Sequence, residues 1–595
     1  MRSVSEKQVG INLGEADQFP EYEWTRRKIL KVISAGGVGS AVFARALSAQ
    51  VAEGTVTVEM IRQAEWITGM EFSDQERELM VRRMRGRLDR SAELREVPLD
   101  PEVPPALAFD PAPWAGNVAS GSDGVVEISE SAARRRPDSS EDLAFATVTE
   151  LAALVRTRQV SSVELTRLYL DRLRRYDPVL HCVITYTDEL ALNQAEKADR
   201  EIAAGRYRGP LHGIPWGAKD NLAVPGYRTT WGAMPYKDQV LSQKATVAAR
   251  LEEAGAVLVA KLSKGAFGGD VWFGGQTRNP WNPERGTGGS SAGSAAATAA
   301  GLVGFSIGTE ARGSIVWPSR NCGVTGLRPT FGRVSNYPMA VYWSTRKVGP
   351  IARSVEDCAL VFHAIHGADG LDPSAVDRPF HWPLRRDVRS LRVGYVESLF
   401  ESDRIESSVP EEIKAAQREW QQLNRRTLEV LRELGIELIP IKLPNLPALA
   451  ALSVIMGAES AAGYDEQARS GDPSVRGPNA RFPLGGQLIP AVEYIRANRI
   501  RTLIMEEMER LMSEVDVYVS PSGTQESDIN HTNLTGHPAV VLPNGYGFRE
   551  ISRSGGVNGI MFTGKLYGET ELLALAHAYQ QATDFHLRRP PLQEP

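Results

Sequence analysis

The most constraining feature of the sequence is a recurring order of helix, glycine and buried strand. Helical periodicity over residues 245–254 ends at Gly255, and an apolar run follows at 256–261. Glycine at such a position ends a helix in the left-handed conformation, which other residues rarely adopt. The same order recurs over residues 411–441, which predicts repeated packing of helices against the strands of one sheet.

Further elements fit the same pattern. Two more apolar runs, at 391–396 and 515–519, have the length of buried strands. Residues Ser161 to Glu164 match an N-terminal cap and predict a helix that runs toward Tyr176. Strands that alternate with helices predict an α/β fold with a mixed, mostly parallel central β-sheet covered by helices on both faces.

The first 49 residues have the order of an export signal. Residues 25–31 read TRRKILK and open a basic region, and a short apolar run that contains glycines follows at 32–47. The segment resembles a twin-arginine signal, which implies export to the periplasm or out of the cell. The alternative is an uncleaved amphipathic helix on a cytoplasmic protein. The apolar run is too short and too rich in glycine for a stable membrane span.

The rest of the chain divides into three segments by composition. Residues 50–110 form a predicted helical extension, with one helix capped by Thr57 and a second that begins at a capping box from Ser73 to Glu76. Residues 111–142 are rich in Ser, Gly and Arg and lack apolar periodicity, which predicts a linker or surface loop. Residues 143–590 carry the alternating helices and strands and form the predicted main domain.

Charge and cysteine content exclude several classes of protein. The 595 residues include 68 basic and 73 acidic side chains, a net charge of −5, so no basic face for a nucleic acid is indicated. Cys182, Cys322 and Cys358 lie too far apart in the sequence to suggest a disulfide framework or a zinc site. No Gly-x-Gly-x-x-Gly begins a helix after a strand, which disfavours a dinucleotide. We therefore predict no metal, no cofactor and no nucleic-acid partner, and the sequence leaves a homo-oligomer open.

The densest local signal is a glycine–serine segment. Residues 286–294 read GTGGSSAGS, and an alanine-rich run follows at 295–300. Closely spaced glycines permit positive φ and let backbone N–H groups approach a ligand. A phosphate-binding loop would need a Gly-Lys-Ser/Thr ending, which is missing. A flexible linker would not lead directly into helix-forming alanines. The third interpretation is a loop that positions catalytic hydroxyls.

Other motifs accompany this segment and favour the third interpretation. Residues 211–220 read LHGIPWGAKD, residues 308–315 read GTEARGSI, and residues 323–330 read GVTGLRPT. Together these motifs resemble the amidase signature family. Its pattern combines a Gly-Gly-Ser-Ser loop with a Gly-Thr-Asp-x-Gly-Gly-Ser-Ile loop.

The spacing and the flanking segments extend the resemblance. Ser290 and Ser314 are 24 residues apart, which fits the family. Residues 348–357, VGPIARSVED, and residues 533–539, NLTGHPA, also match. The resemblance runs from about residue 143 to near residue 583, and so covers the main domain, which it implies is the catalytic domain.

The resemblance implies a serine hydrolase with a Ser–Ser–Lys triad. In this chain Ser314 attacks the carbonyl carbon and becomes acylated, Ser290 transfers the proton, and Lys219 is the base. In the family the peptide bond at the Ser290 position is cis. An amine accepts a proton only when it is neutral, and burial at the end of the apolar run 214–218 favours a neutral Lys219.

Backbone groups complete the site that the resemblance implies. The oxyanion hole is expected from the N–H groups of Ala311, Arg312, Gly313 and Ser314, because a developing negative charge needs fixed donors. Ser291 is expected to fix the glycine–serine loop by hydrogen bonds, and it is also a candidate substrate-binding residue.

Three residues depart from the family pattern. Family members commonly have Asp where Glu310 stands, Gly where Arg312 stands, and Arg where Val316 stands. We predict that Arg312 supplies the displaced cation and pairs with Glu310. The alternative is that Arg312 points into the cleft and selects an acidic or polar substrate.

The sequence indicates the residues that determine substrate specificity less clearly than it indicates the catalytic residues. Trp272 and Phe273 are the predicted apolar wall of the substrate pocket, although aromatic residues near a site more often belong to the core. Residues 265–273, 337–346 and 459–492 are further segments expected to line the pocket.

The leading prediction is an amidase that hydrolyses small-molecule linear carboxylic amides rather than peptide bonds, and also esters, aryl amides or carbamates. The alternative is an amidotransferase A-type subunit that releases ammonia from glutamine, which the export-like N-terminus disfavours because that machinery is cytoplasmic. A binding protein without chemistry is the third hypothesis, and the presence of Lys219, Ser290 and Ser314 disfavours it.

Overall fold

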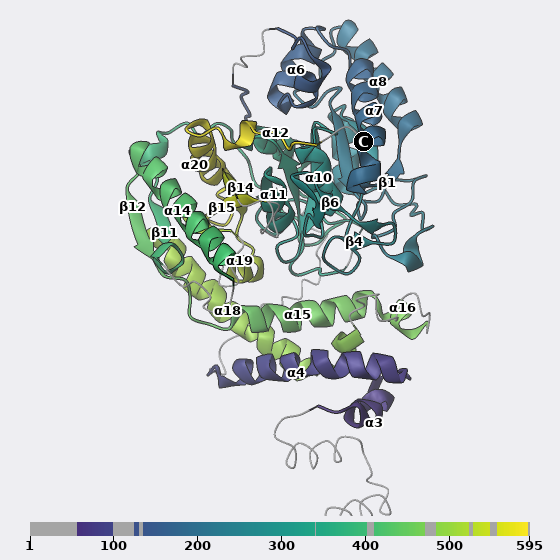
Figure 1. Cartoon of the computed structure of the whole chain (residues 1–595), viewed down its shortest axis with the longest axis vertical. Helices are drawn as coiled ribbons and strands as arrows, with labels where there is room; N and C mark the ends of the chain where they lie inside the picture. Colours follow the sequence, from purple (N-terminus) through teal and green to yellow (C-terminus); the bar gives the residue numbers. More distant parts are fainter. Residues whose placement is uncertain are drawn as a thin grey trace, which may run out of the picture. The chain divides into compact units, whose positions relative to one another are not determined.

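The structure of the protein is a computed structural model (Figure 1). The described residues are 56–68, 70–98, 124–129, 135–338, 341–401, 410–470, 484–522, 528–547 and 556–592. The predicted export signal at residues 1–49 and most of the predicted linker at 111–142 lie outside these ranges. The chain divides into two compact units, residues 1–85 and residues 86–595.

The first unit contains only the first part of the predicted helical extension, which was expected to run to residue 110. It holds α3 (Val58–Thr68) and the beginning of α4 (Asp74–Glu96). The Met60 N–H donates to Thr57 Oγ1 at 3.2 Å, which confirms the first cap. The Ser73 N–H donates to Glu76 Oε2 at 2.6 Å and the Glu76 N–H to Ser73 Oγ at 3.3 Å, which confirms the capping box.

The second unit is built on a mixed sheet of eleven strands. Their spatial order is β1 (Val183–Tyr186), β3 (Val257–Leu262), β2 (Pro215–Lys219), β8 (Phe305–Glu310), β10 (Lys347–Ala352), β9 (Thr325–Arg328), β14 (Ala539–Tyr546), β15 (Val557–Gly564), β13 (Val517–Pro521), β11 (Val393–Val396) and β12 (Leu438–Ile441). Two small ribbons pair β4 (Val271–Trp272) with β5 (Gly275–Gln276), and β6 (Arg278–Asn279) with β7 (Asn282–Gly286).

The sheet is mixed, as predicted, but the prediction that it is mostly parallel is wrong. Six of its neighbouring pairs are antiparallel and four are parallel. In its centre β10 lies antiparallel between β8 and β9. The sequence could not show this, because a strand that is buried on both faces is an apolar run whichever way its neighbours run.

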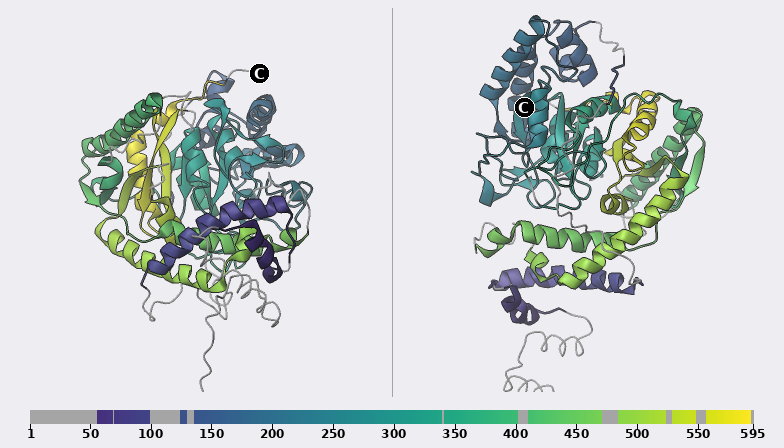
Figure 2. Two further views of the ribbon diagram at one scale, coloured as in Figure 1. Left: turned by 60° about the horizontal axis from the view of Figure 1, so that its bottom comes forward. Right: turned by 180° about the vertical axis from the view of Figure 1, so that it is seen from behind.

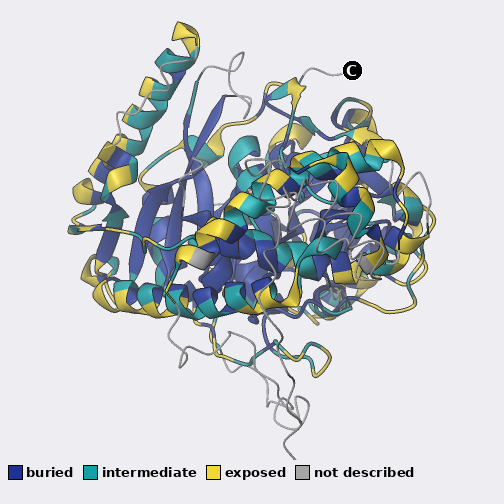
Figure 3. Cartoon of the chain, turned by 90° about the horizontal axis from the view of Figure 1, so that it is seen from below, coloured by how far each residue is buried: buried dark blue, intermediate teal, exposed yellow. Residues whose placement is uncertain are grey.

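Helices cover both faces of the sheet, which confirms that part of the prediction (Figure 2). Val540 and Leu542 of β14 pack in one cluster with Leu572 of α20, whereas Val541 packs in another with Val316 of α11. Alternate residues of a strand point to opposite faces, so α20 and α11 lie on opposite sides. The inner strands of the sheet are buried, whereas the edge strands β1 and β12 are partly exposed (Figure 3).

The helices of this unit follow in chain order. They are α5 (Ser140–Ala144), α6 (Val148–Arg156), α7 (Ser162–Leu180), α8 (Asp188–Ala203), α9 (Thr246–Glu253), α10 (Ala292–Ala299), α11 (Val316–Cys322), α12 (Val355–Ile365), α13 (Glu397–Glu401), α14 (Glu411–Glu433), α15 (Ala448–Gly463), α16 (Asp465–Arg469), α18 (Ala491–Glu514), α19 (Ile529–Thr535) and α20 (Glu569–Gln581). Among the described residues, none of the helices combines the length and the apolar character that crossing a membrane requires.

The predicted order of helix, glycine and strand is confirmed in both places. Gly255 follows α9 with φ +80° and leads into β3, and Gly435 follows α14 with φ +80° and leads into β12. The Ser161 side chain accepts from the Glu164 N–H and caps α7, which extends beyond Tyr176 to Leu180. Parallel pairing of β2 with β8 inside the sheet brings the carboxyl ends of these two strands together, and the predicted residues Lys219 and Ser314 lie at or just after these ends.

Candidate active site

The predicted base lies at the end of a buried strand. Lys219 is the last residue of β2 and has no exposed surface. Its Nζ lies 3.0 Å from Ser290 Oγ and 2.8 Å from Ser291 Oγ. The third contact is to the Thr309 carbonyl oxygen, which accepts from Nζ at 2.9 Å. The structure therefore brings Lys219 and Ser290 together, as the sequence predicts.

The surroundings of Lys219 favour a neutral amine. Burial lowers the pKa of Lys219 well below its ordinary value, and the charges of Lys264 and Arg346 lower it further. The Glu310 carboxylate acts in the opposite direction but does not outweigh them.

The glycine–serine loop supplies two of the three contacts of the Lys219 amine. The peptide bond between Gly289 and Ser290 is cis, as the family resemblance implies. Ser291 is completely buried, donates through Oγ to the Thr309 carbonyl at 3.2 Å, and accepts there from the Thr309 N–H at 3.2 Å. Ser291 therefore fixes the loop, as the sequence predicts, but it does not line the cavity, so its prediction as a substrate-binding residue is not borne out.

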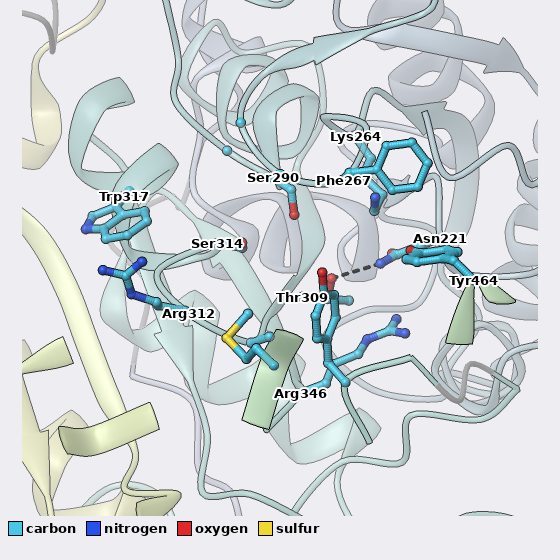
Figure 4. A pocket seen from close by; sticks show the side chains of 16 residues that line it. Asn221, Lys264, Phe267, Ser290, Thr309, Arg312, Ser314, Trp317, Arg346 and Tyr464 are labelled. Carbon is cyan, nitrogen blue, oxygen red and sulfur yellow. Dashed lines mark hydrogen bonds between the residues drawn. The ribbon is translucent and has the colours of Figure 1, made fainter. Parts of the chain in front are cut away.

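Ser314 lies in the loop that joins β8 to α11. Its carbonyl accepts from the Ser291 N–H at 3.1 Å, which holds the two serine loops side by side. Ser290 and Ser314 both line one cavity (Figure 4). Within the described part of the chain, the Ser314 hydroxyl forms no hydrogen bond, so the contact between Ser314 and Ser290 that the triad predicts is not formed in this structure.

The loop before Ser314 presents backbone donors. Among the described residues, no acceptor is hydrogen-bonded to the N–H groups of the predicted oxyanion hole, Ala311, Arg312, Gly313 and Ser314. Gly313 has φ +75°, and a Cβ added there would meet the Trp317 ring at 2.5 Å. The loop therefore requires glycine at this position to keep its shape.

Glu310 fixes the other end of this loop. Its Oε2 accepts from the N–H groups of Ile315 and Val316 at 2.8 and 3.0 Å. Its Oε1 accepts from Arg328 Nη1 at 2.9 Å and from Asn533 Nδ2 at 3.0 Å. Burial alone would raise the pKa of Glu310, but the charge of Arg328 and these hydrogen bonds outweigh it and lower the pKa to about 2.

The prediction that Arg312 pairs with Glu310 is therefore wrong. The cation is Arg328, on β9, and both side chains of the pair are completely buried. Arg312 instead donates from Nε to Asn530 Oδ1 at 2.9 Å, and its guanidinium lies 5.6 Å from the centre of the Trp317 ring. It lines the cavity, as the alternative interpretation expects.

Substitution of Arg328 by methionine is expected to lower the free energy of unfolding by about 3–5 kcal/mol, because it leaves the buried Glu310 carboxylate without its cation. Urea denaturation near pH 7 measures this loss. The matched control is Arg312→Met, which removes a guanidinium from the loop between β8 and α11 that is not paired with Glu310, and it should cost less than about 1.5 kcal/mol. Equal losses in the two variants would contradict the assignment of Arg328 as the partner.

The cavity has a volume of about 180 Å³, several times the volume of a water molecule. Its lining is Asn221, Lys264, Phe267, Gly268, Gly269, Gly289, Ser290, Thr309, Ala311, Arg312, Ser314, Trp317, Tyr342, Arg346, Met456 and Tyr464. Each of the three segments expected to line the pocket contributes, through Phe267, Tyr342 and Tyr464 among others.

The prediction that Trp272 and Phe273 form the wall is not borne out, since neither lines this cavity. Trp272 belongs to the β4–β5 ribbon, its Nε1 donates to the His181 carbonyl at 3.1 Å, and its ring packs edge-on against Phe273. The two rings therefore pack against each other, and the indole N–H is hydrogen-bonded to the neighbouring backbone rather than directed at a substrate.

Several lining residues were missed in the sequence. Lys264 lies two residues after the end of β3, and its Nζ donates to the carbonyl groups of Trp231 and Gly265 at 3.1 Å each. Met456 comes from the long helix α15. Asn221 donates from Nδ2 to Thr309 Oγ1 at 2.9 Å (Figure 4). The only signal for Asn221 and Lys264 was their position just after a predicted strand, which many non-functional residues share.

Comparison with known sequences identifies the family. The family model named Amidase matches residues 164–542. The A-type subunit of the Glutamyl-tRNA(Gln) amidotransferase from Roseiflexus sp. strain RS-1 is 35% identical over 487 residues, which cover 73% of this chain and 96% of that protein. The protein of the same name from Methylococcus capsulatus is 34% identical over 488 residues, with 75% and 98% covered.

Comparison with solved structures identifies related enzymes as well. The peptide amidase from Stenotrophomonas maltophilia superimposes with a TM-score of 0.63 and 29% identity, over 75% of this chain and 98% of that one. The A-type subunit of the Glutamyl-tRNA(Gln) amidotransferase from Thermotoga maritima gives a TM-score of 0.58 and 25% identity, with 74% and 95% covered. The chain therefore belongs to the amidase signature family of enzymes, which act on carbon–nitrogen bonds.

Proposed function

We propose that the protein hydrolyses carboxylic amides of small molecules through an acyl-enzyme on Ser314. The observation that carries this proposal is the contact between the buried Lys219 amine and the Ser290 hydroxyl, at the edge of a cavity that Ser314 also lines. An amide carbonyl is a poor electrophile, so its attack needs an activated hydroxyl and donors for the oxyanion.

The hydrogen-bonding capacity of a neutral Lys219 supports the proton path. A neutral amine has two hydrogens and one lone pair, and Nζ has three neighbours. The Thr309 carbonyl can only accept, which leaves the lone pair for a serine hydroxyl. Ser290 can donate to Lys219 in this arrangement and can accept the proton of Ser314 as Ser314 attacks.

The remaining steps follow from this path. As the Ser314 Oγ bonds to the carbonyl carbon, the oxyanion accepts from the free N–H groups of residues 311–314, each worth about 3–4 kcal/mol of transition-state stabilisation. Ser290 then gives a proton to the leaving nitrogen and recovers one from Lys219 as the carbon–nitrogen bond breaks. Water attacks the ester by the same path in reverse and releases the acid.

The curated relatives support a second candidate. They carry the name of an amidotransferase component, so the chain would release ammonia from glutamine for transfer to another substrate. Both candidates share the acyl-enzyme and differ in the amide. Glutamine carries an ammonium, and none of the residues that line the described cavity is an Asp or Glu that could pair with it.

We also propose that the protein is exported, because residues 25–31 resemble a twin-arginine signal. An exported enzyme would be separated from cytoplasmic tRNA, which favours the hydrolase of the two candidates.

Reaction in the presence of hydroxylamine tests the shared step. Purified protein is incubated with simple amides, aryl amides, esters and glutamine, and hydroxamate formation is measured together with the mass of the peptide that contains Ser314. We expect hydroxamate from at least one compound and the matching acyl mass on Ser314. Ammonia release from glutamine above that from every other amide would favour the second candidate. Product without hydroxamate or acylated Ser314 would reject both candidates.

A further inference from the structure

The least satisfied charge in the described structure lies in the same cavity as the two serines. Arg346 directly precedes β10, and only 3% of its surface is exposed. Its Nε, Nη1 and Nη2 atoms are buried, and none of them has a hydrogen-bond partner within the described part of the chain. A guanidinium has five N–H donors, and a buried charge is normally paired, so Arg346 requires a partner that the protein does not supply.

Neighbouring charges do not provide that partner. Lys264, which also lines the cavity, is buried and bonded only to carbonyl groups. Burial lowers the pKa of Lys264 to about 8, and the positive charge of Arg346 adds to this effect. Asp372 acts on Arg346 from a distance, but its carboxylate accepts from the Asn336 and Ser374 N–H groups. Among the described residues, no ion pair includes Arg346.

Arg312, the cation that the sequence singles out, differs in this respect. Its Nε is bonded to Asn530, and its guanidinium packs on Trp317. Arg346 therefore has more donors to offer a bound molecule than Arg312 has, and Figure 4 shows its guanidinium at the cavity.

We propose that Arg346 binds a carboxylate of the substrate, so that the enzyme is selective for amides that carry an anionic group away from the bond that is cleaved. This inference rests on the proposed amide hydrolysis and specifies its substrate class. The planar guanidinium can bind a carboxylate through two parallel hydrogen bonds, which are stronger at a buried guanidinium such as that of Arg346 than at an exposed one. The absence of Asp and Glu from the lining of the described cavity disfavours cationic amides for the same reason.

Two matched pairs of substrates test the selectivity. Glutaric acid mono(4-nitroanilide) and pentanoyl 4-nitroanilide differ by a carboxylate on the acyl side, and 4-acetamidobenzoate and 4-methylacetanilide differ by one on the amine side. Measured where the rate no longer depends on pH, wild-type kcat/KM should favour the anionic member of at least one pair by about 10- to 100-fold. Equal values within both pairs would overturn the inference.

Variants then assign the preference to Arg346. Arg346→Met should remove the preference, so that the ratio of kcat/KM between the anionic and the neutral member of a pair falls to about one. Arg346→Lys should restore part of that ratio, because lysine keeps the charge but cannot form two parallel hydrogen bonds with a carboxylate. Arg510→Met, on the exposed surface of α18, is the matched control and should behave as wild type. An Arg346→Met enzyme that still prefers the anionic member would overturn the assignment.

A binding measurement on the wild type keeps the inference testable if the variant does not fold or no anilide is cleaved. Glutarate should slow fluorophosphonate labelling of Ser314 and raise Tm, and 1,5-pentanediol of similar length should do neither. Equal effects of the two compounds would reject the carboxylate subsite alone. If Ser314 is neither labelled nor acylated, the proposed hydrolysis fails instead, and the Tm shift with glutarate still decides whether the cavity binds a carboxylate.

Discussion

Substitution of Ser314 by alanine is expected to lower kcat by about 10⁴- to 10⁶-fold, because it removes the atom that bonds to the substrate carbon. The fold should be retained, since within the described residues the Ser314 hydroxyl has no hydrogen-bond partner to lose. Steady-state kinetics on any amide that the wild type cleaves measures the loss, and the fluorophosphonate probe should label the wild type only.

Variants of two other serines serve as controls for the loss of activity and labelling in Ser314→Ala. Ser513 is exposed on α18 and donates only to the Arg510 carbonyl, so Ser513→Ala should keep full activity and labelling. Ser291→Ala loses a contact to Lys219 but not the nucleophile, so it should react more slowly and still be labelled. Labelling of Ser314→Ala at wild-type rate would show that another residue is the nucleophile.

The second large effect is expected at Lys219. Its replacement by alanine removes the general base, and we expect a loss of about 10²- to 10⁴-fold in kcat/KM. In the wild type the base must be neutral, so the rate should rise with pH as Lys219 loses its proton. The pKa of Lys219 is lowered by burial, Lys264 and Arg346, so this rise should be complete below the ordinary lysine range.

Substitution of Lys264 by methionine tests whether the charge of Lys264 helps to lower the pKa of Lys219. Lys264 is positively charged below about pH 8 and holds the pKa of Lys219 down, so its removal should raise that pKa and move the acid limb to higher pH. The pH dependence of kcat/KM measures the shift, with Lys565→Met, outside the cavity, as control. An acid limb that stays in place, or that moves to lower pH, would contradict Lys219 as the titrating base.

Much of the fold could be predicted because it is determined locally. Gly255 and Gly435 mark helix ends by their positive φ, and each leads into a strand. The antiparallel position of β10 could not be predicted, because it depends on which strands meet and not on what each strand contains.

In the candidate active site, too, the features that depend on contacts between distant residues could not be predicted from local sequence alone. The contact between Lys219 and Ser290 was predictable only through the family motifs, since 71 residues separate them. The partner of Glu310 was not predictable, because Arg328 lies on β9, two strands from β8 with β10 between them. Arg346 was expected in the lining, but a sequence cannot show that its guanidinium has no partner.

The hydrogen bond between Asn533 and Glu310 has a consequence for incomplete copies of this protein. All three triad side chains are encoded before residue 315, yet the carboxylate that shapes the oxyanion loop is held by an amide more than 200 positions later. A premature stop codon between residue 315 and α19 would therefore give a polypeptide that retains every reacting group and is not a competent enzyme.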